Sequence, residues 1–232
     1  MTQKLRVLGL ALVAVLAMSA IASANAFAFK GESLNTSNGL HESGTIKGSG
    51  INTQSFKITS GSLVTLTCSG VTTSEASTGS EETPQAEPHY TGCSAAGFPA
   101  EVKPNGCKYK FHTTTETVAG MNYTGTTDVV CGAGAGPFVY KIFESNGTTL
   151  RCEVEVKPQT GINNIEYVNT TNTTEPTDVD IKASSNNVKT KVLFGSFFAC
   201  GASGENSTGT YSGETTVRFF NGAGTQIDYT IM

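Results

Sequence analysis

Six cysteines constrain the fold of this chain more than any other feature. All of them follow an N-terminal segment that has the pattern of an export signal. An even number of cysteines in an exported chain is typical of a fold braced by disulfides, because the oxidising space outside the cytoplasm lets such bonds persist. We therefore expect all six to be paired: Cys68, Cys93, Cys107, Cys131, Cys152 and Cys200.

Residues 1–26 are interpreted as a signal peptide. Lys4 and Arg6 supply its positive end, residues 7–17 its apolar core, and the small residues at 24–26 its cleavage site. The apolar run is too short for a comfortable membrane span, and no stop-transfer segment follows it. We therefore expect a secreted, extracellular protein without a stable membrane anchor.

Charge and composition narrow the class further. Without Lys4 and Arg6, the 15 basic residues fall to 13 against 19 acidic ones, so the net charge is about −6 at pH 7. This sign disfavours nucleic acid and anionic membranes as partners, since both reward clustered Lys and Arg. Frequent Thr and Gly favour strands and turns over helices.

Alternating side chains mark the strands. In residues 150–156, Cys152, Val154 and Val156 alternate with charged residues, the pattern of a half-buried strand. This strand pairs with residues 137–143 in a predicted hairpin. Four Asn-Gly pairs, at 38–39, 105–106, 146–147 and 221–222, predict chain reversals. Further strands are predicted at 55–59, 63–68, 107–112, 123–130, 164–169, 178–183, 188–194, 210–220 and 226–231.

These strands predict an all-β, antiparallel, sandwich-like fold, Ig-like or related, that is braced by disulfides. We divide the mature chain into an N-terminal β region at 27–118 and a C-terminal one at 119–232. They form either two small β domains or one continuous domain. The polar segments 72–88 and 169–176 are predicted to be loops, the first of them long and mobile.

Six cysteines allow fifteen pairings, and sequence alone does not choose among them. If the strands before and after residues 118–121 form a hairpin, Cys107 falls opposite Cys131. Sequential pairing then joins the remaining four in chain order. The alternative is a metal or redox site, but no Cys-x-x-Cys occurs. We predict no metal and no cofactor.

No catalytic residue is predicted. His41, His89 and His112 stand outside any nucleophile or metal motif, and we expect them on the surface. Glu153 and Glu155 share one face of a strand, as a glycosidase pair would, yet basic neighbours explain them by charge pairing.

Two weaker patterns remain open. Asp178 and Asp180 form an Asp-x-Asp that could contribute to a calcium site. Six Asn-x-Ser/Thr sequons would accept glycans in a eukaryotic secretory host, whereas a Thr-rich bacterial sequence contains them by composition. They lie at Asn35, Asn122, Asn146, Asn169, Asn172 and Asn206.

Several cysteine-containing runs resemble a pattern that recurs in uncharacterised exported β-rich proteins of soil actinobacteria. The resemblance covers most of residues 60–215 and implies bacterial export, but no activity. It rests on Tyr90-Thr91-Gly92-Cys93, Gly97-Phe98-Pro99-Ala100, Asn105-Gly106-Cys107-Lys108-Tyr109-Lys110-Phe111, Cys152-Glu153-Val154-Glu155-Val156-Lys157-Pro158-Gln159 and Gly209-Thr210-Tyr211-Ser212-Gly213.

The sequence thus predicts an extracellular binding or surface-structural module, which recognises a protein or carbohydrate partner through exposed loops on a rigid scaffold. Two alternatives stay open. One is a secreted hydrolase that uses paired carboxylates, and the other is a secreted inhibitor or toxin.

Overall fold

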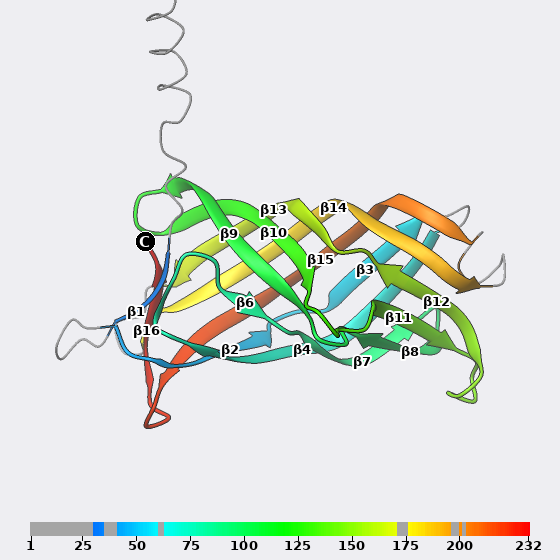
Figure 1. Ribbon diagram of the computed structural model, residues 1–232, viewed down its shortest axis with the longest axis horizontal. Coiled ribbons are helices and arrows are strands. Elements are labelled where there is room, and N and C mark those ends of the chain that lie inside the picture. Colours follow the sequence, from blue (N-terminus) through cyan, green and yellow to red (C-terminus); the bar gives the residue numbers. More distant parts are fainter. Residues whose placement is uncertain (1–29, 35–40, 60–62, 171–175, 196–199, 201–202) are drawn as a thin grey trace, which may run out of the picture.

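The computed structural model describes residues 30–34, 41–59, 63–170, 176–195, 200 and 203–232, and every element within them is a β-strand (Figure 1). The all-β prediction is therefore confirmed. The interpreted signal peptide, the Asn38-Gly39 pair and the sequons at Asn35 and Asn172 lie outside the described residues. The strands are β1 (Gly31–Leu34), β2 (Gly44–Gly50), β3 (Gln54–Thr59), β4 (Leu63–Ser77), β5 (Ser80–Glu81), β6 (Gln85–Ala86), β7 (His89–Ala95), β8 (Phe98–Lys103), β9 (Cys107–Val118), β10 (Asn122–Cys131), β11 (Phe138–Phe143), β12 (Leu150–Val156), β13 (Gln159–Thr170), β14 (Asp178–Gly195), β15 (Gly204–Asn221) and β16 (Gln226–Ile231).

The strands pair antiparallel in one sheet that closes on itself. Eight of them form a ring in the order β2, β4, β7, β8, β11, β12, β14 and β15, and β15 also pairs with β2. The predicted sandwich is therefore corrected to a barrel. A sandwich needs free edges between two sheets, whereas β14 and β15 pair with each other over most of their 18 residues and leave no such edge.

The two regions predicted at 27–118 and 119–232 share this sheet. β2 of the first region lies beside β15 of the second, and β8 lies beside β11. The barrel core is therefore built from both regions.

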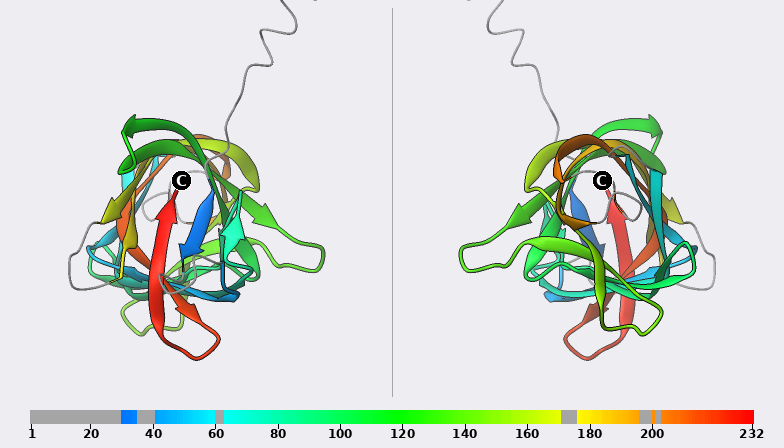
Figure 2. Two further views of the ribbon diagram at one scale, coloured as in Figure 1. Left: turned by 90° about the vertical axis from the view of Figure 1, so that its left-hand side faces the viewer. Right: turned by 90° about the vertical axis from the view of Figure 1, so that its right-hand side faces the viewer.

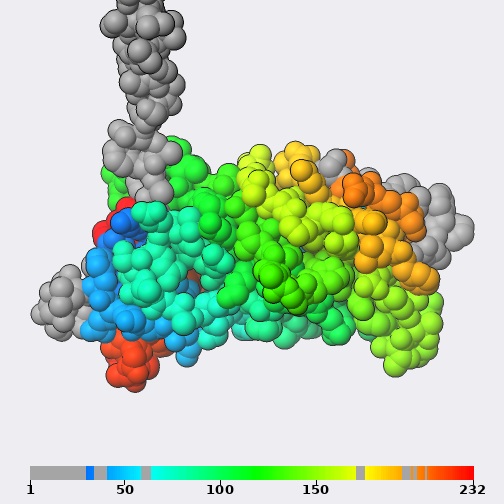
Figure 3. Space-filling model, viewed as in Figure 1, coloured from blue at the N-terminus to red at the C-terminus, as the bar shows by residue number. Residues whose placement is uncertain are grey.

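The wall of the barrel changes along its length, because β14 exchanges one neighbour for another. Residues 190–195 pair with β12, whereas residues 178–183 pair with β13. From β13 the sheet continues through β10 and β9 to the short β6. The result is an elongated body whose two halves have different walls (Figures 1 and 3).

One end of the barrel is crossed by β16 and β1, which Figure 2 shows in red and blue. The Asn169 side chain holds β16 in place: its Nδ2 donates to the carbonyl oxygen of Ile231 at 2.9 Å, and its Oδ1 accepts from the Ile231 amide at 2.9 Å. Only 4% of Asn169 is exposed. A glycan on this sequon is therefore incompatible with the folded end.

The structure pairs the cysteines in chain order. Cys68 is bonded to Cys93, Cys107 to Cys131, and Cys152 to Cys200. Cys107 lies directly opposite Cys131 in the β9–β10 ladder, so the predicted hairpin register is confirmed. The first two bonds each join neighbouring strands of the wall, and the third ties residue 200 to β12.

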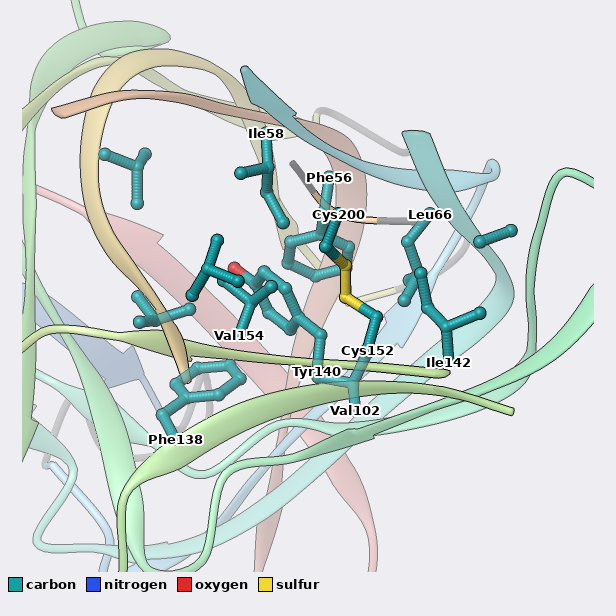
Figure 4. Close-up of a cluster of buried hydrophobic side chains, with 14 of the residues drawn as sticks. Phe56, Ile58, Leu66, Val102, Phe138, Tyr140, Ile142, Cys152, Val154 and Cys200 are labelled. Atoms are coloured by element: carbon teal, nitrogen blue, oxygen red, sulfur yellow. A yellow bond between two sulfur atoms is a disulfide. The ribbon is translucent and has the colours of Figure 1, made fainter. Parts of the chain in front are cut away.

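Two clusters of buried apolar side chains fill the barrel. The larger contains Phe56, Leu66 and Phe138 and surrounds the Cys152–Cys200 bond (Figure 4). The smaller contains Phe219 and lies toward the end that β16 covers. In strands such as β12 the inward side chains follow every second residue, as the pleat of a sheet requires.

The segment 72–88 was expected to be a mobile loop, and this expectation is wrong for much of it. Residues 72–77 extend β4 and pair with β2, and the rest forms β5, β6 and their connections. Polar contacts replace the missing apolar residues: Glu75 binds the Lys108 ammonium at 2.7 Å and accepts the Glu87 amide at 2.9 Å. Residues 72–77 therefore have the composition of a loop although they form a strand, because the outward side of that strand is polar.

Candidate functional site

A cavity of about 100 Å³ within the barrel is the main candidate for a functional site. Members of both apolar clusters line it, including Phe56 and Val188 of the larger and Ile46 and Val217 of the smaller. No Asp, Glu, Lys, Arg or His contributes to the lining. The site is therefore suited to an apolar, uncharged molecule, because an unpaired charge is costly to bury.

Two small residues face each other at the cavity wall. Ala183 of β14 lies directly opposite Gly213 of β15, and both line the cavity. Larger side chains, Tyr211 and Val217, point inward before and after Gly213 on β15. At Gly213 the Gln54 side chain occupies the position that a Cβ would take, whereas Ala183 contributes only a methyl group to the lining.

An aromatic cluster forms part of the lining. Phe56 is 2% exposed, and its ring centroid lies 4.8 Å from those of Tyr140 and Tyr211 and 5.2 Å from that of Tyr90. These distances are typical of favourable aromatic pairs. Figure 4 shows Phe56 and Tyr140 side by side, next to the Cys152–Cys200 bond.

The tyrosine hydroxyl groups are held by hydrogen bonds. Those of Tyr90 and Tyr109 lie 3.1 Å apart, and the Tyr211 hydroxyl donates to Oε1 of the fully buried Gln54. The Gln54 amide nitrogen donates to the backbone oxygens of Asn52 at 2.9 Å and Glu214 at 3.2 Å. The Gln54 amide is thus held to the backbone through its nitrogen and to the Tyr211 hydroxyl group through its oxygen, which fixes the position of that hydroxyl group.

Burial perturbs these tyrosines. It raises the pKa of Tyr211 to about 12, although a hydrogen bond with Tyr90 opposes the rise. Burial, together with neighbouring tyrosines, also raises the pKa of Tyr90, Tyr109 and Tyr140 above 10.0. All four remain neutral hydroxyl groups at physiological pH.

Ser185 is the one cavity-lining residue whose side-chain oxygen is buried without a hydrogen-bond partner among the described residues. It is 3% exposed and lies directly opposite Tyr211 on the neighbouring strand. Thr190 and Thr230 also carry unpaired buried hydroxyl groups, but neither lines the cavity. An unpaired polar atom costs about 1–3 kcal/mol, so its presence at the cavity wall calls for an explanation.

Gly213→Ala is expected to destabilise the protein by about 2–4 kcal/mol. The new Cβ would lie 1.9 Å from Gln54 Oε1, and Gln54 could move away only by giving up its buried hydrogen bonds. Urea denaturation measures the change. Gly132→Ala is the control, because nothing lies within 4 Å of its Cβ position. Equal midpoints for both variants would contradict this role of Gly213.

The carboxylates considered for catalysis do not reach this cavity. Glu153 pairs with Lys141 at 3.6 Å, and Glu155 pairs with Lys157 at 3.0 Å. Both glutamates alternate with the inward Val154 and therefore face the outside of the barrel. Glu153 pairs across the strands, and Glu155 pairs with a lysine two residues along the chain, so charge pairing accounts for both carboxylates, as the sequence indicated.

The remaining sequence candidates also lie apart from the cavity. His112 Nε2 contacts Asp128 Oδ2 at 2.9 Å, His41 contacts the Ser33 backbone oxygen at 3.1 Å, and His89 is exposed. Asp178 binds Arg218 at 3.0 Å.

Asp180 accepts a hydrogen bond from the Thr216 hydroxyl at 2.7 Å. Among the described residues, no three His, Cys, Asp or Glu side chains gather into a group that could hold a metal ion.

Comparison with known proteins adds no relative: no family model, no curated protein and no solved structure matches this chain. Within the described ranges, no helix has both the length and the apolar character needed to cross a membrane. The three disulfides are compatible with an extracellular protein.

Sequence reasoning missed the cavity residues, although one strand carries a readable signal. On β15 the inward positions are Tyr211, Gly213, Thr215, Val217 and Phe219. Gly213 and Thr215 thus interrupt, at its centre, a face that otherwise carries larger side chains. Such an interruption indicates missing volume or a bound molecule.

Proposed function

We propose that this protein is an extracellular binding protein that holds a small, mostly apolar molecule inside its barrel. The observation that carries the proposal is the uncharged cavity between the two apolar clusters. An apolar cavity of about 150 Å³ is known to take up benzene, so a space of this order is useful for binding. Rigid walls tied by disulfides favour a preformed site.

The proposal keeps the binding class that the sequence predicted but places the ligand inside the barrel instead of at exposed loops. A hydrolase based on Glu153 and Glu155 is less well supported, because both carboxylates are paired with lysines on the outer face. Secretion remains part of the proposal and is supported by the three disulfides and the interpreted signal peptide.

Benzene is expected to bind the full mature protein and to shift the NMR signals of the Ile and Val methyl groups that line the cavity. Ala183→Leu should weaken this binding at least about tenfold, since Ala183 lines the cavity and the larger side chain extends into it. Ala76→Leu makes the same change at an exposed position of β4 and should leave benzene binding unchanged. Absence of methyl shifts in the wild-type protein would overturn the proposal.

A further inference from the structure

Ser185 points to the chemistry of the ligand. Its hydroxyl group is buried, faces the cavity and has no hydrogen-bond partner among the described residues. Buried polar groups in native proteins almost always have a partner, so the partner of Ser185 is expected within the cavity itself. A molecule that occupies the cavity would meet this oxygen.

The rest of the lining defines the remainder of the molecule. Phe56, Phe111 and six tyrosines contribute aromatic surface to the cavity. Aromatic side chains favour ring-shaped partners through offset or edge-to-face contacts. The volume of about 100 Å³ limits the ligand to about one ring.

The hydrogen-bonding group of the ligand must be neutral. No charged side chain lines the cavity, and the hydroxyl groups of Tyr90, Tyr109 and Tyr211 already contact one another or Gln54. A carboxylate would therefore enter without a counter-charge, which is strongly unfavourable. A hydroxyl group can both donate to and accept from a serine oxygen.

We propose that the ligand is a neutral single-ring compound with one hydroxyl group, a phenol, and that Ser185 Oγ forms the hydrogen bond to that group. This inference rests on the proposed function. It adds the substrate class and names the residue that distinguishes a phenol from an unsubstituted ring. Ser185 acts here as a specificity-determining residue of a binding site.

The test compares phenol, benzene and benzoate with the full mature protein, with binding followed by the methyl shifts of the lining residues. Phenol and benzene should bind, and benzoate should not. Ser185→Ala should weaken phenol binding at least about fivefold, because the buried ligand hydroxyl then lacks its partner. The same variant should change benzene binding less than about twofold.

Thr190→Val is the matched control, since it removes another unpaired buried hydroxyl group that does not line the cavity. It should alter neither affinity. Benzene binding by Ser185→Ala also verifies that the variant folds with its cavity intact. Without ligand, this variant should be at least as stable as the wild type, because it loses an unpaired polar atom.

The outcomes separate the two proposals. If neither phenol nor benzene binds the wild-type protein, the proposed function fails. If benzene binds but phenol affinity is the same in Ser185→Ala and in the wild type, the cavity is a binding site and the phenol inference is wrong. The same conclusion follows if benzoate binds as well as phenol does.

Discussion

Alkaline titration is expected to unfold this protein in one cooperative step between about pH 10 and pH 12. All seven of its tyrosines have a pKa raised mainly by burial, and six of them line the cavity: Tyr90, Tyr109, Tyr140, Tyr167, Tyr211 and Tyr229. The unfolded chain releases their protons near pH 10, whereas the folded chain holds them. Stability is therefore unaffected below pH 10 and is lost as the pH rises above it.

The size of this effect follows from the number of groups. Each buried tyrosine contributes a loss of about 1.4 kcal/mol for each pH unit once only the unfolded state is ionised. Six together contribute about 8 kcal/mol per pH unit, which is comparable to the 5–15 kcal/mol that stabilises a typical domain. Two pH units above pH 10 would thus remove about 16 kcal/mol, so the folded state should not survive beyond about pH 12.

Two measurements check this result together: the ultraviolet absorbance of tyrosinate and the circular dichroism of the sheet. Both should change in the same pH range, and the same protein in denaturant should show tyrosinate absorbance rising near pH 10 without a second transition. Tyr140→Phe should shift the native transition to higher pH. Reversible ionisation of most tyrosines near pH 10 with the sheet intact would show that the cavity wall is open to water.

Reduction of the three disulfides is expected to unfold the protein at neutral pH. The sequence separations of the bonds are 25, 24 and 48 residues. On the chain-entropy model each bond of this size contributes about 3–4 kcal/mol. Their combined contribution is similar to the whole stability of a typical domain.

The order of reduction should follow burial. Cys152 and Cys200 are 0% and 1% exposed, whereas Cys93 and Cys131 are partly exposed. A thiolate must reach a sulfur atom to attack it, so the Cys152–Cys200 bond should be the last to open. Mass spectrometry after alkylation at successive times gives the order, and circular dichroism reports the fold.

Two results would contradict this account. One is any free thiol in the unreduced protein under denaturing conditions, because every cysteine described is bonded. The other is a fully reduced protein that retains its circular dichroism and its urea midpoint. A double variant with Cys152→Ser and Cys200→Ser lacks this bond in the absence of any reductant. It therefore separates the effect of losing the bond from other effects of the reductant.

The sequence predicted the local structure well where alternation and turn chemistry agree. Residues 150–156 alternate inward and outward side chains in the structure as expected, and they pair with β11 through a turn at Asn146-Gly147. Both signals lie within a few residues, so they can be read directly from the sequence. The Cys107–Cys131 register followed from the same kind of local argument.

Closure of the barrel could not be predicted, because it depends on partners far apart in the chain. Residues 178–183 and 188–194 were expected to form two separate strands, with Ser184 to Asn187 between them. The structure joins them into β14 through an irregularity between Ser185 and Val188, where Asn187 has a φ of 60°. Pairing with β15 along this whole length overrides the local preference.

Glycine explains why β2 was missed. Gly44 carries no side chain that could mark a strand, yet a Cβ at this position would lie 2.1 Å from the Phe220 backbone oxygen. The cavity was missed for a related reason. Ala183 and Gly213 are about thirty residues apart in the chain, and they become neighbours only through the register of β14 and β15. The sequence around either residue does not indicate this pairing.

The covered end of the barrel has a consequence for how the molecule folds. β1 pairs with β16, so that Gly31 lies beside Ile231 at opposite ends of the described chain. Contacts of such long range close large loops and form slowly, because the entropy of closure must be overcome before they contribute. Docking of β16 carries Tyr229 and Ile231 to the cavity wall. We therefore expect this end of the barrel to close only when both β1 and β16 are present, and the interior at this end to be completed last.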